Sequence, residues 1–262
     1  MARPAVVLAY HGLGEVPRAL DPHGLVVPPA DFRKHVRILR GRGYDFVTQR
    51  EFARRLREGG GPPPATASLT FDDGPEDNAT LLPGLLEELG VPATLFVNAG
   101  LLGEPYRWVA PETGIRVMSE EQLREVARHP LVEIGSHTSR HTVLADADEG
   151  TAYAELEGSR IELEELLGIE VVSFAYPDCD YSPACPPAAE RALYTSAVTC
   201  DGRGGWSPFE LRRESPSPSD GRLIFELKAR GRFHAVRSLP PVRLARRVRQ
   251  ALPLSKRGRI VS

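Results

Sequence analysis

Along the chain, short apolar runs typical of strands alternate with longer stretches in which apolar residues recur at helical spacing. The strand-like runs are rich in β-branched and aromatic residues and stop at polar or Gly/Pro positions, as buried parallel strands do. They cover residues 5–9, 44–48, 68–71, 93–97, 132–135, 171–175 and 197–200. Helices are predicted mainly between them, over residues 31–42, 50–58, 81–89, 119–128 and 153–167. This order predicts a parallel α/β architecture.

Polar residues that can do chemistry follow these strands repeatedly. In a closed parallel barrel, positions after the strands gather at the C-terminal mouth, where sites are built. A barrel-like α/β fold would therefore bring together His11, Asp72, Asp73, His137, His141 and Asp178. A long excursion over residues 100–117, which contains Trp108, is expected to lie over one end of the fold and to line the pocket.

His137 and His141, together with the Asp72-Asp73 pair, predict a metal site. Two imidazoles four residues apart can converge on one ion from a helical turn or a tight loop, although two structural histidines are about as plausible for this pair alone. With one carboxylate they form a His₂Asp set that leaves a position open for water, as catalytic zinc sites do. The other carboxylate can then take a proton, and a nearby protonated histidine can act as general acid. These residues predict metal-assisted hydrolysis of an amide or ester.

Length and charge restrict the function classes. The chain has 262 residues and a formal net charge of -2, which does not favour nucleic acid or an anionic membrane as partner. No apolar run approaches the roughly 20 residues of a membrane span, and the apolar run at residues 5–9 is too short for the core of a signal peptide. We therefore expect one domain over residues 1–262 and a cytoplasmic location. A basic segment from about residue 240 is predicted to be helical and to pack on the barrel, rather than to meet a nucleic acid, a membrane or an acidic partner.

The three cysteines, Cys179, Cys185 and Cys200, are expected to be reduced thiols without a special role. Their spacing matches no zinc-binding pattern, and an odd number cannot form a complete disulfide framework. Cys179 is the exception of interest, because it lies in the motif that follows residues 171–175.

Several motifs together resemble the polysaccharide deacetylase (NodB-homology) family, carbohydrate esterase family four. Thr70-Phe-Asp-Asp-Gly-Pro75 and Ser136-His-Thr-Ser-Arg-His141 carry most of the resemblance. Phe174-Ala-Tyr-Pro177 is similar to the branch that includes exopolysaccharide N-deacetylases. The resemblance implies a distorted (β/α) barrel, a divalent metal that is most often Zn²⁺, and removal of N- or O-acetyl groups from sugars.

The resemblance also implies a role for each matching residue. Asp72 would be the catalytic base, and Thr70 would support the site from its strand. The family's late catalytic histidine has no clear match, because His234 lies in a different context, so His11 is the candidate general acid. The residues that would bind the metal are Asp73, His137 and His141. The residues that would face the substrate and the oxyanion are Tyr176, Pro177 and Asp178.

The third block of the motif departs from the family pattern. Many members carry an arginine there that orients the base, whereas Ala175 stands at that position in this chain. Asp178-Cys179 also replaces an aromatic residue and a glycine. An arginine from a later stretch, Arg212 or Arg213, could take over the orienting role, and the sequence leaves this choice open.

The expected function is removal of an acetyl group, in the first place N-acetyl, from a sugar or sugar-containing substrate. One alternative is hydrolysis of a non-sugar amide or cyclic imide, which would need the same metal chemistry. Another is a non-catalytic carbohydrate-binding descendant, which the altered third block would suit. The presence of Asp72 with all three metal ligands favours an enzyme.

Overall fold

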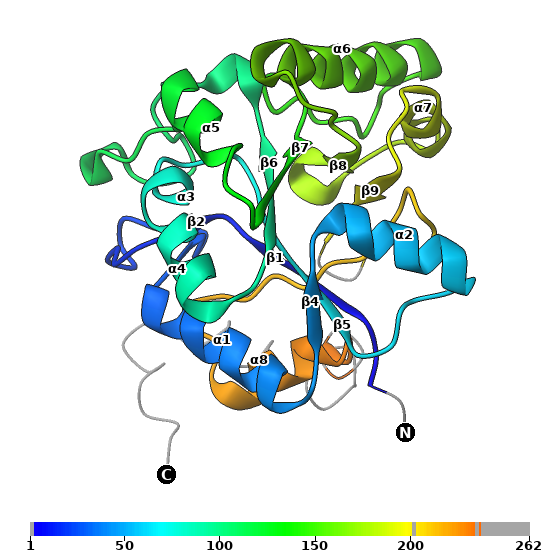
Figure 1. Ribbon diagram of the computed structural model, residues 1–262. Coiled ribbons are helices and arrows are strands. Elements are labelled where there is room, and N and C mark those ends of the chain that lie inside the picture. The colour runs from blue at the N-terminus through cyan, green and yellow to red at the C-terminus, as the bar shows by residue number, and fades with distance from the viewer. Residues whose placement is uncertain (1–2, 201–202, 234–235, 237–262) are drawn as a thin grey trace, which may run out of the picture.

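The protein folds into a curled parallel sheet surrounded by helices (Figure 1). The computed structural model describes residues 3–200, 203–233 and 236. The strands are β1 (Val6–Tyr10), β2 (Gly12–Leu13), β3 (Val26–Val27), β4 (Asp45–Val47), β5 (Thr66–Phe71), β6 (Ala93–Val97), β7 (Val132–Ser136), β8 (Ser173–Ala175) and β9 (Ser196–Val198). The helices are α1 (Pro29–Gly41), α2 (Gln49–Gly59), α3 (Asp77–Thr80), α4 (Leu82–Leu89), α5 (Glu120–Val126), α6 (Glu149–Leu167), α7 (Cys185–Arg191) and α8 (Arg222–Ala229). Short 3₁₀ turns are η1 (Ala99–Leu101), η2 (Pro111–Thr113) and η3 (Pro177–Cys179). The predicted barrel-like α/β fold is confirmed.

The main sheet is ordered β1-β5-β6-β7-β8-β9, with β4 also paired to β5, and all its strand pairs are parallel. A later segment, residues 211–214, lies between the two ends of this order. Leu211 bridges Val198 of β9, and Glu214 bridges Leu8 of β1, both in parallel. The segment therefore completes the ring and brings residues distant in sequence next to β5.

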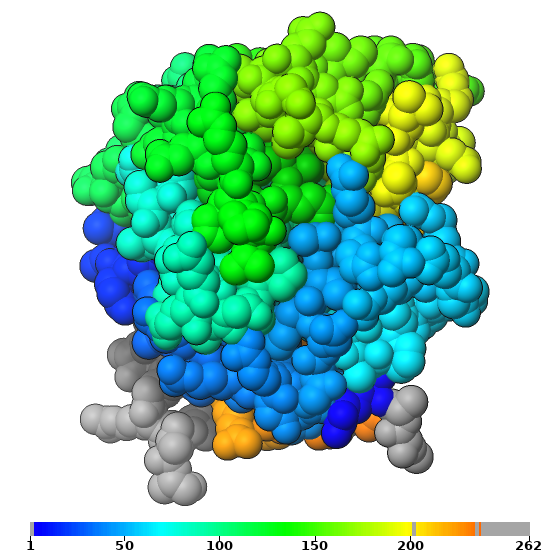
Figure 2. Space-filling view, viewed as in Figure 1, coloured from blue at the N-terminus to red at the C-terminus, as the bar shows by residue number. Residues whose placement is uncertain are grey.

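Helices and loops cover the outside of the sheet, so most of its strand residues are buried. β1, β5 and β6 are buried along their whole length, as expected for a parallel sheet covered on both sides. The space-filling view shows the closed surface that segments coloured blue to yellow form on this face of the molecule (Figure 2). Packing around β7 is close at Gly135, where a Cβ atom would lie 2.6 Å from the Phe96 ring and 2.8 Å from the Ser173 carbonyl oxygen. This glycine lets β7 approach its neighbours just before it delivers His137.

Some elements differ from the prediction. α6 begins at Glu149, earlier than expected, because the Asp148 side chain accepts the Thr151 N–H and caps the helix. The helices α3, α7 and α8 and the short strands β2 and β3 were not predicted. α7 is short and has two prolines in its first turn, which are compatible with a helix start but also typical of a turn. No helix in residues 3–200, 203–233 and 236 is long and apolar enough to span a bilayer. The basic segment from about residue 240 and His234 lie outside the described residues.

His35 of α1 gives the fold an acid-sensitive contact. Its buried imidazole stacks on Phe225 of α8 with 4.0 Å between ring centroids, and Nδ1 lies 3.2 Å from the Tyr10 hydroxyl. Burial, aided by Lys34 and Lys228, lowers the pKa of His35 from 6.5 to about 4. The unfolded chain therefore binds this proton at a higher pH than the folded chain, so the stability contributed by neutral His35 is lost as the pH falls through this range.

We expect His35 alone to lower the free energy of unfolding by up to roughly 3 kcal/mol between about pH 7 and about pH 4. Urea denaturation at both ends of this range measures the change. The His35→Gln variant keeps an acceptor for the Tyr10 hydroxyl but does not titrate, so it should lose less stability in acid. Equal losses in the two proteins would contradict the prediction.

Candidate functional site

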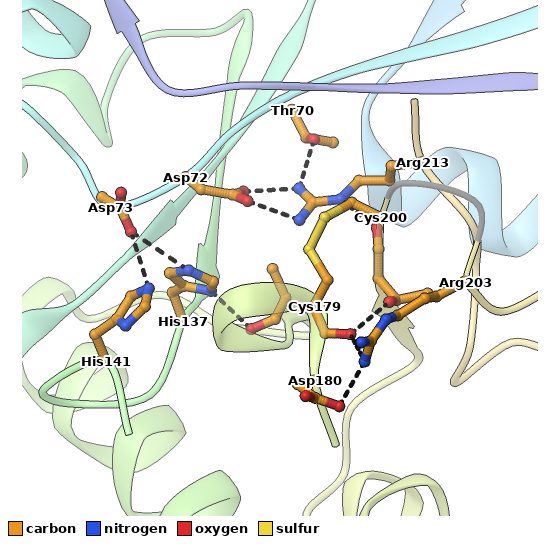
Figure 3. Close-up of a disulfide and its surroundings, with 12 residues drawn as sticks. Thr70, Asp72, Asp73, His137, His141, Cys179, Asp180, Cys200, Arg203 and Arg213 are labelled. Carbon is orange, nitrogen blue, oxygen red and sulfur yellow. Dashed lines mark hydrogen bonds and ion pairs between the residues drawn. A yellow bond between two sulfur atoms is a disulfide. The ribbon is translucent and has the colours of Figure 1, made fainter. Parts of the chain in front are cut away.

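Asp72 and Asp73 follow β5 directly and point in different directions. Asp73 and Gly74 both adopt left-handed backbone conformations, with φ of 68° and 69°, and this turn separates the two carboxylates. Figure 3 shows Asp73 directed at two histidines and Asp72 directed at Arg213. The turn therefore gives the adjacent carboxylates two different surroundings.

Asp73, His137 and His141 bring three ligand atoms together, one from each residue and all within 4.8 Å of one another. Oδ1 of Asp73 lies 3.4 Å from Nε2 of His137 and 3.6 Å from Nε2 of His141. These contacts are longer than normal hydrogen bonds, and within the described residues this buried oxygen accepts none. A buried carboxylate oxygen that faces two imidazole nitrogens is well suited to a cation. The three residues thus fit a divalent metal, as the His₂Asp pattern predicted.

His137, directly after β7, is held in one tautomer by the backbone. Its Nδ1 lies 2.7 Å from the carbonyl oxygen of Ala175, which can only accept, so Nδ1 carries the hydrogen and Nε2 faces Asp73. Burial lowers the pKa of His137, but the nearby carboxylates Asp73 and Asp72 outweigh burial and raise it. A proton and a metal ion would therefore compete for Nε2. Ala175 stands where many members of the family that the sequence resembles have an arginine. In this chain its backbone carbonyl contributes to the site by orienting His137.

His141 lies in a tight loop, one of the two geometries considered for the histidine pair. Thr138 and His141 have φ of 60° and 59°, and the Thr138 Oγ1 accepts the Thr142 N–H at 2.8 Å. The Trp108 ring packs on the imidazole with 4.7 Å between centroids. Burial, followed by the nearby His137, lowers the pKa of His141 to about 4. His141 is therefore neutral near pH 7, the state that a metal ligand requires.

Arg213 holds Asp72 in a buried, two-pronged ion pair. Its Nη1 and Nη2 donate to Oδ1 and Oδ2 of Asp72 at 2.7 and 2.6 Å. Nη1 also donates to Oγ1 of Thr70 at 2.9 Å, and Nε donates to the Thr199 carbonyl oxygen at 2.8 Å. Burial raises the pKa of Asp72, but the Arg213 charge, assisted by His137, lowers it below its ordinary value. Asp72 is thus ionised and fixed in orientation.

The two candidate arginines lie in different places. Leu211 and Arg213 are buried, whereas the guanidinium of Arg212 lies over the Trp206 ring, 4.9 Å from its centroid. Arg212 is absent from the lining of the cavity that holds Asp72, as far as the described residues show. Of the two alternatives left open by the sequence, the structure places only Arg213 on the candidate base.

His11 lies at the same site, on the turn after β1. Two side chains of α3 hold this turn by hydrogen bonds. Nδ2 of Asn78 donates to the His11 carbonyl oxygen at 2.9 Å, and Oδ1 of Asp77 accepts the Leu13 N–H at 2.8 Å. Burial raises the pKa of Asp77 to about 7. The backbone of His11 is thus well anchored, and its role as general acid stays a prediction.

The predicted residues share a cavity of about 210 Å³. Its lining includes Asp72, Asp73, His137, His141, His11, Tyr176, Asp178 and Trp108. Pro177 is buried and is not among the lining residues of the described chain. A larger cavity, of about 480 Å³, lies against α8 beside Arg3 and Arg230 but contains no such group of ligands, so we place the site in the smaller one.

The sequence did not single out two further residues of the site. His23 lines the cavity from a turn in which the carboxylate of Asp21 accepts the N–H groups of Leu25 and Val26. The buried Tyr106 hydroxyl donates to Oδ2 of Asp73 at 3.0 Å. Burial and the adjacent Asp73 raise the pKa of Tyr106, which keeps it a donor. The sequence around His23 is typical of a turn, and Tyr106 lies in a long loop without a periodic pattern. Neither pattern indicates a contact with the site.

The expectation that the cysteines are reduced and incidental is wrong for two of them. Cys179 and Cys200 form a disulfide with 5.4 Å between their Cα atoms, and both line the cavity. Cys185 is free and buried. A spacing of 21 residues does not reveal this pair, because the two positions meet only when η3 and the end of β9 lie side by side.

Sequence comparison points in the same direction as the geometry. A family model described as polysaccharide deacetylase matches residues 59–197. The Bacillus subtilis (strain 168) protein YxkH, which is named as a polysaccharide deacetylase, is 26% identical over 195 residues, 74% of this chain and 64% of that protein. A chitin deacetylase from Pestalotiopsis sp is 33% identical over 105 residues, 40% of this chain and 31% of that protein. The chain thus spans less than two thirds of these curated relatives.

Solved structures share the fold. IcaB from Ammonifex degensii matches with a TM-score of 0.72 at 22% identity, covering 88% of this chain and 97% of that one. The Streptococcus pyogenes deacetylase PplD, solved in complex with acetate, matches with a TM-score of 0.70 at 22% identity, covering 84% of this chain and 95% of that one. The predicted distorted (β/α) barrel is therefore confirmed. Because the family model matches more than half of this chain, the chain belongs to the polysaccharide deacetylase family.

Proposed function

We propose that this protein is a metal-dependent hydrolase that removes an acetyl group, in the first place N-acetyl, from a sugar or sugar-containing substrate. The observation that carries the proposal is the pairing of two differently held carboxylates at one cavity. Asp73 faces His137 and His141, while Asp72 is ionised and aligned by Arg213. Family membership and the deacetylase names of the relatives support the reaction type.

Each neighbouring residue has a task that its surroundings suit. A metal at Asp73, His137 and His141, which we propose to be Zn²⁺, would polarise the acyl carbonyl and make water more acidic. Asp72 takes a proton from the attacking water, because its lowered pKa keeps it ionised and Arg213 holds its orientation. His11 donates a proton to the leaving nitrogen from the same cavity.

The turn after β8 would meet the substrate and the oxyanion. The Tyr176 N–H donates to the Val198 carbonyl oxygen at 3.1 Å, and Pro177 has no N–H. Of the three residues proposed for this role, only Asp178 can therefore offer a backbone N–H to a developing negative charge. Tyr176 and Asp178 contribute to the cavity wall, whereas buried Pro177 shapes the turn.

The direct test is acetate release by the purified protein from N-acetylglucosamine oligomers, with O-acetylated sugars and a non-sugar N-acetyl amide in parallel. Release from the sugar amide supports the proposal. Cleavage of only the non-sugar amide would keep the chemistry and overturn the sugar substrate. Binding of sugar with no release of acetate, in metal-loaded protein, would support a carbohydrate-binding descendant instead.

Arg213 offers a specific prediction for this reaction. Arg213→Lys keeps the positive charge but cannot donate in parallel to both oxygens of Asp72. A base displaced by about 1 Å costs on the order of 100-fold, so we expect kcat for acetate release to fall by about 10- to 100-fold with metal content unchanged.

The adjacent Arg212→Lys is the matched control, because Arg212 packs on Trp206 away from the cavity. It should keep near wild-type turnover. Equal losses in the two variants, or no loss in Arg213→Lys, would remove Arg213 from the orienting role.

A further inference from the structure

The Cys179–Cys200 disulfide joins the two loops that flank the candidate base. Cys179 ends η3, the turn after β8 that carries Asp178, and Cys200 lies two residues beyond the end of β9. Both residues line the cavity of the proposed site. In Figure 3 the bond lies beside the Asp72–Arg213 pair, between it and the Cys179–Asp180 turn.

The turn that the disulfide holds is strained. Asp178 and Cys179 are consecutive non-glycine residues with φ of 51° and 58°, a left-handed conformation that costs each of them free energy. Two polar contacts also hold the turn: Arg203 donates to Oδ1 of Asp180 at 2.5 Å in an exposed ion pair, and the hydroxyl of buried Thr199 donates to the Cys179 carbonyl oxygen at 3.2 Å. Exposed ion pairs contribute little stability, so the covalent bond is the strongest restraint on this turn.

The other end of the bond restrains Arg213. Cys200 directly follows Thr199, whose carbonyl oxygen accepts a buried hydrogen bond from Nε of Arg213 at 2.8 Å. The same guanidinium then holds both oxygens of Asp72. A displacement of the backbone at residues 199–200 would therefore move Arg213, through its hydrogen bond to the Thr199 carbonyl oxygen, and with it the Asp72 carboxylate.

We propose that the Cys179–Cys200 disulfide is a positioning cross-link for the deacetylation, so that the protein is fully active only when the bond is formed. This inference rests on the proposed function. Reduction by a phosphine takes two electrons and two protons: the S–S bond becomes two thiols, while the phosphine is oxidised to its oxide with an oxygen from water. The freed Asp178 turn and Thr199 backbone then relax, and turnover falls while the metal stays bound, because neither cysteine belongs to the Asp73, His137 and His141 set.

Two comparisons test the inference on the full, metal-loaded chain, at a temperature where circular dichroism shows each protein to be folded. Wild-type protein is assayed oxidised, reduced with a phosphine and reoxidised, with thiol counts and metal content at each stage. We expect kcat to fall by about 10-fold on reduction, the low end of what a misplaced catalytic group costs, with metal content unchanged and recovery on reoxidation. The Cys179→Ser/Cys200→Ser double variant should show the lower kcat throughout and ignore the reductant.

Cys185→Ser is the matched control, because Cys185 is the free, buried cysteine of the described chain. It should respond to reduction as the wild type does. A folded double variant with wild-type kcat would overturn the inference, since a merely structural cross-link changes the melting temperature and not kcat. Loss of activity in reduced wild type but not in the double variant would also overturn it, because free thiols would then be the cause. No acetate release from the oxidised protein would overturn the proposed function, and this inference with it.

Discussion

Replacing Asp72 with asparagine is expected to lower kcat for acetate release by about 10²- to 10⁴-fold, the contribution of a positioned general base. Asparagine has nearly the same shape but no negative charge, so it cannot take a proton from water. The metal should stay bound, because Asp72 faces Arg213 whereas Asp73 faces His137 and His141. Initial rates of acetate release, measured with metal content on the same samples, test both parts.

The matched control for this change is Asp45→Asn. Asp45 is an exposed residue of β4 that pairs with Arg55, so its loss should leave kcat unchanged. Asp72→Asn leaves Arg213 without its carboxylate, so folding must be checked by thermal melting. A folded, metal-loaded Asp72→Asn protein with wild-type turnover would show that another group is the base.

Replacing His137 with alanine is expected to remove metal and activity together. Residues that only orient a metal ligand already contribute about 10- to 100-fold to affinity, so loss of a ligand itself should weaken binding by more than about 100-fold. After dialysis, elemental analysis should find about one metal per wild-type chain and almost none in the variant. Acetate release should fall to background.

His129→Ala is the control for the loss of an imidazole, because His129 pairs with Glu87 and does not belong to the ligand set. It should keep both metal and turnover. A His137→Ala protein that holds a full equivalent of metal would exclude His137 as a ligand. One that loses metal and still releases acetate would separate the metal from the reaction.

The sequence predicts those features that depend on local pattern. Short apolar runs predicted the strands, and the residues after them were expected at one mouth, where the structure places Asp72, Asp73, His137 and His141. The motif spacing was sufficient because each candidate ligand lies within a few residues of a strand end. The His137→Ala and Asp72→Asn variants test their roles as ligand and base.

Features that depend on register could not be predicted. Arg212 and Arg213 are adjacent, and neighbouring strand residues face opposite sides, so only the pairing of residues 211–214 with β9 and β1 decides which one reaches Asp72. The Cys179–Cys200 bond depends in the same way on two loops that meet after folding. Tyr106 reaches Asp73 from a long loop whose path has no periodic signal.

The disulfide also bears on where the protein works. Disulfides persist in oxidising compartments and are rare in the reducing cytoplasm. A cytoplasmic location stays a prediction, and under the inference above it would keep the Cys179–Cys200 pair reduced and the enzyme at its lower activity. Thiol counts on protein taken directly from its native compartment would measure this state.

We propose that the Asp73, His137 and His141 set binds a metal that acetyl removal requires. The most direct measurement is a titration of metal-free protein with Zn²⁺, following acetate release from N-acetylglucosamine oligomers. We expect activity to rise from background and to level off at about one equivalent per chain. Full acetate release by metal-free protein, or no release after a full equivalent has bound, would contradict a metal requirement at this site.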